Sequence, residues 1–233
     1  IAKTKSVNFQ NGAGATLNRV TGTDLSKIEG SLSASGSVYV MNSAGVLVGR
    51  TGRVDTGGTF IATSGDMADG ATGRRRFSIN GAHRKVNNRG SVVSQNGDVL
   101  LIGNTVINSG NLSAKHGAAV IGAGTSVLIA PNGGSGQLTV RAGTGNATNT
   151  GAIAAASAEL RAAHGNVYAL AGNNGDLISA TGAKAIAGHI WLTSTYGDTV
   201  VDGRLKARSA DNSGGAIETS GARAFSPSAV PAA

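Results

Sequence analysis

A five-residue unit recurs along the chain and constrains its fold more than any other feature: glycine, any residue, an apolar residue, any residue, a second apolar residue. The unit begins at Gly36 (GSVYV), Gly97 (GDVLL), Gly117 (GAAVI), Gly136 (GQLTV), Gly165 (GNVYA), Gly188 (GHIWL) and Gly203 (GRLKA). Apolar residues in alternation have the period of a strand with one buried face, and no helix has this period. The chain is therefore predicted to consist of many short β-strands.

The spacing of the units predicts how these strands are arranged. Gly97 and Gly117 are 20 residues apart, and a second unit, Asn-x-Gly-x-apolar, begins at Asn88, Asn108 and Asn149 with separations of 20 and 41 residues. A period of this length that holds two or three strands is typical of a coil whose turns stack in register. We therefore predict an all-β fold, a parallel β-helix (solenoid) with about 20 residues per turn.

The pattern also predicts the register of the stack. Strands of successive turns would pair in parallel at about 4.8 Å, with Val99 above Ala119 and Leu101 above Ile121. Glycine and asparagine are expected at the corners because both tolerate left-handed backbone conformations. About eleven turns of this kind would make a rod on the order of 50 Å long. The segment 152–164 (AIAAASAELRAAH) has a helix-forming composition, but we interpret it as strand and corner because it directly follows the corner at Asn149.

Composition excludes several classes of protein. Apolar residues make up 40% of the chain, so it can bury a core, whereas aromatic residues make up only 3%, so the core should be slim. Cysteine is absent, which excludes a disulfide scaffold and a thiolate metal site. The four histidines are dispersed, and the Gly-containing stretch at 119–130 lacks the third glycine of a dinucleotide loop. We therefore predict no metal and no cofactor.

The first 64 residues carry a resemblance to a known family. They resemble the secretion domain of filamentous-haemagglutinin-type exoproteins, the secreted partners of two-partner secretion systems in Gram-negative bacteria. The matching motifs are a strand at Val7, Asn8 and Phe9, a second at Leu17, Asn18, Arg19 and Val20, a third over 32–38, and a turn at Asn42, Ser43, Ala44 and Gly45. The turn lacks the proline and the second asparagine of the family pattern. The later segments 149–182 and 214–221 are also similar to repeats of this group.

The resemblance implies a fold, a partner and a location. It implies a right-handed β-helix that an outer-membrane β-barrel transporter secretes to the extracellular space or the bacterial cell surface. It also divides the chain into four expected segments: 1–70 as first coils that resemble the secretion domain, 71–90 as a basic loop outside the coil, 91–222 as β-helix repeats, and 223–233 as an extended tail. Because the chain begins with Ile1, we expect a processed form or a fragment.

One segment is strongly basic. No acidic residue occurs between Gly70 and Gly97, and six cations do: Arg74, Arg75, Arg76, Arg84, Lys85 and Arg89. Cations this close could bind an acidic glycan or lipopolysaccharide. Nucleic acid is a less expected partner, because only Phe77 is available to stack on bases. The alternative interpretation is a solvated loop with no ligand.

An enzyme is the weakest of the functional hypotheses. Some β-helices cleave polysaccharides, and glycoside hydrolysis needs two carboxylates about 5–10 Å apart. The nearest acidic pairs in sequence are Asp66 with Asp69 and Asp198 with Asp202, and both lie beside glycines, as turn residues do. We therefore predict a non-enzymatic protein, since a fold shared with enzymes is no evidence of chemistry.

Two functions remain. The first is a secreted adhesin or exoprotein segment that mediates surface attachment after export by its transporter. The second is a structural subunit of an extracellular filament, in which identical β-helix ends stack head to tail, because an uncapped solenoid exposes unpaired strand edges.

Overall fold

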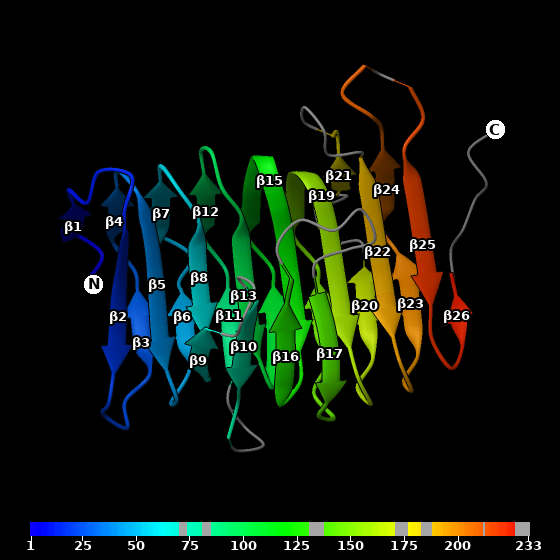
Figure 1. Cartoon of the computed structure of the whole chain (residues 1–233), viewed down its shortest axis with the longest axis horizontal. Helices are drawn as coiled ribbons and strands as arrows, with labels where there is room; N and C mark the ends of the chain where they lie inside the picture. Colours follow the sequence, from blue (N-terminus) through cyan, green and yellow to red (C-terminus); the bar gives the residue numbers. More distant parts are fainter. Residues whose placement is uncertain are drawn as a thin grey trace.

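The computed structural model describes residues 1–69, 74–80, 85–130, 138–170, 177–182, 188–211 and 213–226. Within these ranges the regular elements are β-strands, and they form sheets of fourteen, eight and four strands. The two larger sheets contain parallel pairs throughout and wind the chain into a coil (Figure 1). The coil has its N-terminal strands at one end and its C-terminal strands at the other.

The coil has three faces, each with one strand from every turn. The first face contains β1 (Ser6–Phe9), β4 (Ser31–Ala34), β7 (Arg53–Thr56), β12 (Ser91–Ser94), the first parts of β15 (Asn111–Ala123) and β19 (Ala152–Ala162), β21 (Leu177–Ala180) and β24 (Arg204–Ala207). The second face contains β2 (Ala15–Val20), β5 (Ser37–Asn42), β8 (Phe60–Thr63), β13 (Val99–Gly103), the second parts of β15 and β19, β22 (His189–Ser194) and β25 (Ala216–Ser220). The third face contains β3 (Ser26–Ile28), β6 (Val46–Val48), β11 (Lys85–Asn88), β14 (Thr105–Asn108), β18 (Ala147–Asn149), β20 (Val167–Leu170), β23 (Thr199–Asp202) and β26 (Ala224–Phe225).

The fold is therefore the predicted parallel β-helix. Val99 pairs with Ala119, and Leu101 pairs with Ile121, as the spacing predicts. The described coil has eight turns, one for each strand of the third face, so the expectation of about eleven turns is wrong. The reason is that the turns differ in length, because two of them carry insertions that form strands outside the coil.

Small apolar side chains fill the interior of the coil. On the second face alternate residues point inward, for example Val38, Phe60 and Val99, and each is fully buried. One continuous cluster extends from Ile28 to Leu192. The narrow cross-section explains why valine, isoleucine and alanine suffice and why aromatic residues are scarce, as the composition suggests.

Asparagines stack inside one corner of the coil. The side-chain nitrogen of Asn88 donates to the side-chain oxygen of Asn108 at 2.8 Å, and Asn108 donates in the same way to Asn149 at 2.7 Å. All three are buried, and Asn149 also donates to the Gly151 carbonyl at 2.7 Å. This ladder satisfies polar groups that would otherwise be stranded in the core. The ladder explains why asparagine recurs in the Asn-x-Gly unit, and a left-handed backbone conformation at the corner is not needed to explain it.

The glycine of the same unit is needed for close stacking of the backbone. A Cβ at Gly110 would collide with the carbonyl oxygen of Gly90, and a Cβ at Gly151 with that of Gly110. Neither residue is among the glycines with positive φ in the described chain, which are Gly12, Gly45, Gly143 and Gly182. The expectation that left-handed conformations explain the corner glycines is therefore wrong for this corner.

An antiparallel sheet of four strands, here called the cover sheet, lies over the second face in front of the coil (Figure 1). Its strands, in spatial order, are β17 (Leu138–Ala142), β16 (Ser126–Ile129), β10 (Arg75–Ser78) and β9 (Asp66–Asp69). Apolar side chains between the cover sheet and the coil form a second core, which includes Phe77, Val127 and Leu100. The middle strands of the second face, from β5 to β15, are therefore buried on both sides.

The cover sheet changes the interpretation of two segments. In the segment 71–90, Arg75–Ser78 forms β10 outside the coil, whereas Lys85–Asn88 forms β11 inside it. The unit at Gly136 leads into β17 of the cover sheet and not into a turn of the coil.

The segment 152–164 is mostly the strand β19, as interpreted. In the C-terminal segment, Ala224–Phe225 forms β26 of the third face, and residues 227–233 lie outside the described residues.

Candidate functional site

The turn at residues 42–45 joins β5 on the second face to β6 on the third, and Asn42 organises it. The buried amide of Asn42 donates to the Asp24 carbonyl at 2.8 Å and to the Ser26 hydroxyl at 2.7 Å. Its side-chain oxygen accepts from the Ala44 N–H at 2.8 Å, and its carbonyl accepts from the Gly45 N–H at 2.8 Å. One side chain thus closes the turn and ties it to the turn of the coil before it. No proline is needed for this geometry.

Gly45 completes the turn with a backbone that other residues adopt poorly. Its φ is +108°, and a Cβ there would approach the Lys85 carbonyl oxygen to 2.6 Å. Gly45 is buried, whereas Ser43 is exposed. The turn therefore presents Ser43 outward on a base that Asn42 and Gly45 hold in place.

The structure brings the strand motif Leu17–Val20 next to this turn. β2 pairs in parallel with β5, with Val20 opposite Asn42. A hollow of about 280 Å³ lies at this corner, lined by Arg19, Val20, Thr21, Met41, Asn42, Ser43, Gly65 and Asp66. Two motifs that are separate in sequence thus form one local site.

Asp66 is a member of this site that the sequence interpretation missed. Its carboxylate lies 2.7 Å from the guanidinium of Arg19, and both side chains are largely exposed. The pair links the first turn of the coil to the cover sheet, since Asp66 begins β9. No local sequence signal could have found it, because the two residues are 47 positions apart.

The motif Val7–Phe9 lies elsewhere. It forms β1 on the first face, where Val7 pairs with Leu32 and Phe9 with Ala34. Asn8 accepts a hydrogen bond from the Ser33 hydroxyl at 3.2 Å. On the second face, Asn18 of β2 pairs with Val40. Val7, Leu17 and Val20 are exposed at 37%, 49% and 37%, so the first turn presents apolar side chains that later turns bury.

The five cations of the basic segment that the structure describes are not brought together. Arg74 and Arg76 are exposed on the outer side of the cover sheet. Arg75 points the other way, with its guanidinium carbon 5.0 Å from the centre of the Tyr39 ring. Lys85 begins β11 on the third face, and Arg89 is exposed at the corner that follows. Arg84 lies outside the described residues.

Asp98 lies immediately before β13. Burial raises the pKa of its carboxyl above the ordinary value of 3.8, and the Ala118 N–H and the charge of Arg75 act in the opposite direction. The side-chain oxygen of Asp98 accepts from the Ala118 N–H at 2.8 Å. The raised pKa means that the folded protein holds this proton at a pH where the unfolded chain has released it.

Asp98→Asn should therefore alter the pH dependence of stability. The amide keeps an acceptor for the Ala118 N–H and carries no charge to bury, so we expect the variant to be at least as stable as the parent at pH 7. As the pH falls through the raised folded pKa toward 3.8, the parent binds its proton and should gain stability relative to the variant. Urea unfolding of both proteins between pH 4 and pH 7 measures this difference. A difference that does not change with pH would contradict the prediction.

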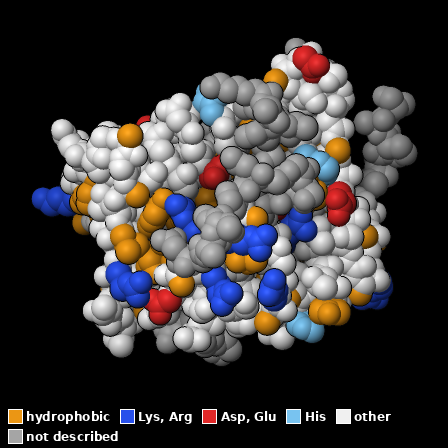
Figure 2. Space-filling model, viewed as in Figure 1, with side chains coloured by type: hydrophobic (Ala, Val, Ile, Leu, Met, Phe, Trp, Pro, Cys, Tyr) orange, Lys and Arg blue, Asp and Glu red, His pale blue; other side chains and the backbone are white. Residues whose placement is uncertain are grey.

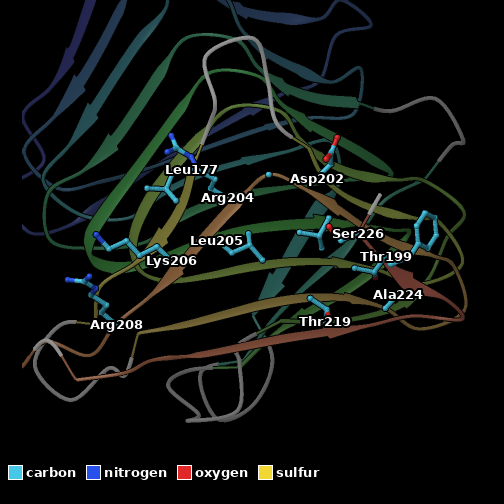
Figure 3. Close-up of a pocket in the computed structure, with 13 residues that line it drawn as sticks. Leu177, Thr199, Asp202, Arg204, Leu205, Lys206, Arg208, Thr219, Ala224 and Ser226 are labelled. Carbon is cyan, nitrogen blue, oxygen red and sulfur yellow. The ribbon is translucent and has the colours of Figure 1, made fainter. Parts of the chain in front are cut away.

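A larger hollow of about 970 Å³ opens at the C-terminal end of the described coil. Figure 3 shows its lining, in which Leu205, Thr219, Thr199 and Ala224 come from β24, β25, β23 and β26. The side chains of Val201, Leu205 and Ala207 pack partly against the interior cluster of the coil. The hollow is therefore the open mouth of the coil interior.

The described residues form neither a metal-binding cluster nor a helix that could cross a membrane. Among the residues that the structure describes, no group of three or more His, Asp or Glu side chains could hold a metal ion. In the same ranges, no helix has the length and apolarity needed to cross a membrane.

Comparisons with known proteins agree with this geometry. A family model described as "TPS secretion domain" matches residues 1–223. The heme/hemopexin-binding protein of Haemophilus influenzae is 30% identical over 131 residues, which cover 52% of this chain and 14% of that protein. The crystal structure of the HMW1 secretion domain from Haemophilus influenzae aligns with a TM-score of 0.67 at 22% identity, covering 90% of this chain and 64% of that chain. The chain thus spans less than two thirds of either relative, and the structural likeness supports the fold.

Proposed function

The chain belongs to the TPS (two-partner secretion) secretion domain family, and on that premise we propose that an outer-membrane β-barrel transporter recognises it at the corner formed by β2 and the turn 42–45. Members of this family are exported to the cell surface or the extracellular space. The observation that carries the proposal is the convergence of Arg19, Val20 and Asn42 on one small hollow. Buried contacts give this corner a defined shape, and exposed side chains surround it.

The architecture of the corner suits recognition during export. Ser43 and Arg19 present polar groups outward, while Asn42 anchors the turn through four hydrogen bonds. The corner also lies near the N-terminal end of the coil, where β1, β2 and β3 pair with β4, β5 and β6 of the next turn. Before those pairs form, the same edges are open to the next segment of chain. Each turn that forms can then template the one that follows.

Asn42→Ile should strongly reduce export. Isoleucine removes every side-chain hydrogen bond of the turn and leaves the Asp24 carbonyl and the Ala44 N–H without their partner. We expect export to fall at least about tenfold when the chain is expressed with its transporter and the secreted fraction is measured. Asn111→Ile is the matched control, because Asn111 is exposed on the first face, and its export should be unchanged.

A second variant keeps the proposal testable if Asn42→Ile does not fold. Arg19→Ala removes a half-exposed side chain from the rim of the hollow and leaves the turn intact. We expect folding to be retained and export to fall severalfold. Normal export of both Asn42→Ile and Arg19→Ala would rule out the corner as the recognition element.

We further propose that the exported domain is a non-enzymatic part of an adhesin that attaches the cell to a surface. One carboxylate of each pair that sequence proximity suggested for catalysis is engaged in an ion pair: Asp66 with Arg19, and Asp198 with Arg223 at 2.6 Å. The Arg223 guanidinium lowers the pKa of Asp198, which opposes a role as a general acid at neutral pH. Binding through an extended surface is the function that such a coil supports best.

The open mouth of the coil favours a second candidate, the filament subunit. Ile217 and Phe225 are exposed at 47% and 48% near this mouth, and β24, β25 and β26 each pair with a strand of the coil on one side only among the described strands. Head-to-tail stacking of identical chains would cover these groups. Electron microscopy of the native material, with intact mass, tests it: long fibres built from 22.9 kDa subunits support stacking, and short uniform rods reject it.

A further inference from the structure

The outer side of the cover sheet carries arginines that no other described element covers. We call this set the arginine surface: Arg74 and Arg76 at β10 and Arg141 on β17, with the hydroxyl side chains of Ser78, Ser126 and Thr139 between or beside them. Arg74, Arg76 and Arg141 are all exposed. In Figure 2, Lys and Arg side chains gather over the middle of this face of the molecule.

The pattern of each strand determines that these arginines point outward. Phe77 and Ile79 alternate with Arg76 and Ser78, and both apolar side chains are buried in the second core. On β17, Leu138 and Val140 are buried in the same core, so Arg141 must face solvent. The orientation of the arginines is therefore a consequence of the packing beneath them.

The strand register gives the spacing of the surface. Arg76 lies opposite Leu128 on β16, and Leu128 lies opposite Thr139 on β17. β10 and β17 are separated by one strand, so the two strands lie about 10 Å apart. Arg141 lies two residues beyond Thr139, which places the backbones of Arg76 and Arg141 about 12 Å apart. The pair Ser78 and Ser126 places two hydroxyl-bearing residues opposite each other in the neighbouring row.

The charges of this surface are available to a ligand. In the described part of the chain, Arg74, Arg76 and Arg141 have no ion-pair partner. Asp66, on the adjacent strand β9, is already paired with Arg19. The whole chain carries a net charge of +8, so its field reinforces the attraction for anions.

We propose that the arginine surface binds an anionic polysaccharide. Guanidinium groups bind carboxylate or sulfate through two parallel hydrogen bonds, and the hydroxyls between them can exchange hydrogen bonds with sugar hydroxyls. A sheet face on which the backbones of Arg76 and Arg141 lie about 12 Å apart suits an extended polymer that crosses several strands. The inference deepens the attachment role proposed above and depends on it only for exposure of the domain at the cell surface.

Nucleic acid fits the surface less well. The outward residues in the paired rows of the cover sheet are Ala68, Arg76, Leu128 and Thr139 in one row and Asp66, Ser78 and Ser126 in the other. None is aromatic, so bases have no ring on which to stack. A double-stranded nucleic acid could still contact the arginines through its phosphates, and the experiment must separate the two ligands.

Heparin serves as the probe in a binding experiment with the full chain. We expect salt-sensitive binding, and we expect the triple variant Arg74→Ala/Arg76→Ala/Arg141→Ala to bind at least about tenfold more weakly. The matched control is Lys27→Ala/Arg53→Ala/Lys115→Ala, which removes the same charge from exposed positions on the first and third faces. The control should bind within about twofold of the parent.

Three outcomes would overturn the proposal. They are equal losses in both triple variants, no loss in the arginine variant, and binding of duplex DNA that is as tight as heparin and equally sensitive to the arginine variant. Export is a separate readout, because the arginine surface and the corner at Asn42 have no residue in common. Normal export of a variant that has lost heparin binding would therefore separate attachment from recognition by the transporter.

Discussion

Asn108→Leu is expected to destabilise the coil by about 3 kcal/mol or more. Asn108 is the middle member of the asparagine ladder and is fully buried. It accepts from Asn88 and donates to Asn149, and its side chain also bonds the backbone at Gly110. Leucine is similar in size, but it leaves the Asn149 side-chain oxygen and the Gly110 N–H without a partner in the core, and each such group costs about 1–3 kcal/mol.

Urea unfolding followed by the fluorescence of Trp191, the one tryptophan of the chain, measures this loss. The matched control is Asn87→Leu. Asn87 precedes the ladder residue Asn88 but faces outward, where it pairs with Leu47 and Ile107 of the neighbouring turns. We expect this control to be neutral or slightly stabilising. Similar losses in Asn108→Leu and Asn87→Leu would mean that the ladder contributes nothing specific.

Phe77→Ala is expected to cost about 3–5 kcal/mol, the usual cost of deleting a buried aromatic side chain. Phe77 is fully buried and lies between the cover sheet and the coil, near the middle of the second core. Its strand β10 links β9 to β16, so a cavity at this position weakens both halves of the cover sheet. Hydrogen exchange should show the amides of β10 and β16 opening well before those of the coil interior.

Phe225→Ala provides the comparison for Phe77→Ala, because Phe225 is 48% exposed in the last strand of the third face. We expect a change of less than about 1 kcal/mol in its free energy of unfolding. If β10 exchanges no faster in Phe77→Ala than in the parent, the cover sheet does not depend on this side chain and the prediction fails.

The coil could be predicted from the sequence because its information is periodic and local. The 20-residue separation of Asn88 and Asn108 reappears as their hydrogen bond, and the separation of Val99 and Ala119 reappears as a strand pair. Each turn repeats the same chemistry above the last. Residues that are one period apart in the sequence therefore lie opposite each other on adjacent turns of the coil.

The cover sheet could not be predicted in the same way because its contacts follow no period. β10 pairs with β16, so Arg76 meets Leu128 from a distant part of the chain. The five-residue unit at Gly136 looks like a coil strand, although it leads into β17. One signal was present: the uninterrupted apolar run Val99–Ile102 indicates a strand that is buried on both faces, and so an extra layer.

The candidate site shows the same division. The turn around Asn42 is local, and the residues of its sequence motif form this turn in the structure, while their role in recognition stays a prediction. Asp66 and the outward set at Arg76 and Arg141 depend on non-local pairing and on alternation along strands. Adjacent residues such as Arg75 and Arg76 point to opposite sides of a strand, so a cluster of cations in sequence does not make a cluster in space.

The origin of the cover sheet strands in two different turns has a consequence for passage through a pore. β9 and β10 belong to the third turn, and β16 and β17 to the fifth, so the cover sheet cannot close over the second core until residue 142, the end of β17, is free. If the chain emerges with its N-terminus first, the early turns form while the apolar outer side of the second face is still exposed to water. The cover sheet then closes in one late step. Movement of the chain back through the pore would require the completed cover sheet to unfold. Formation of the cover sheet would thus make the outward movement of the chain hard to reverse.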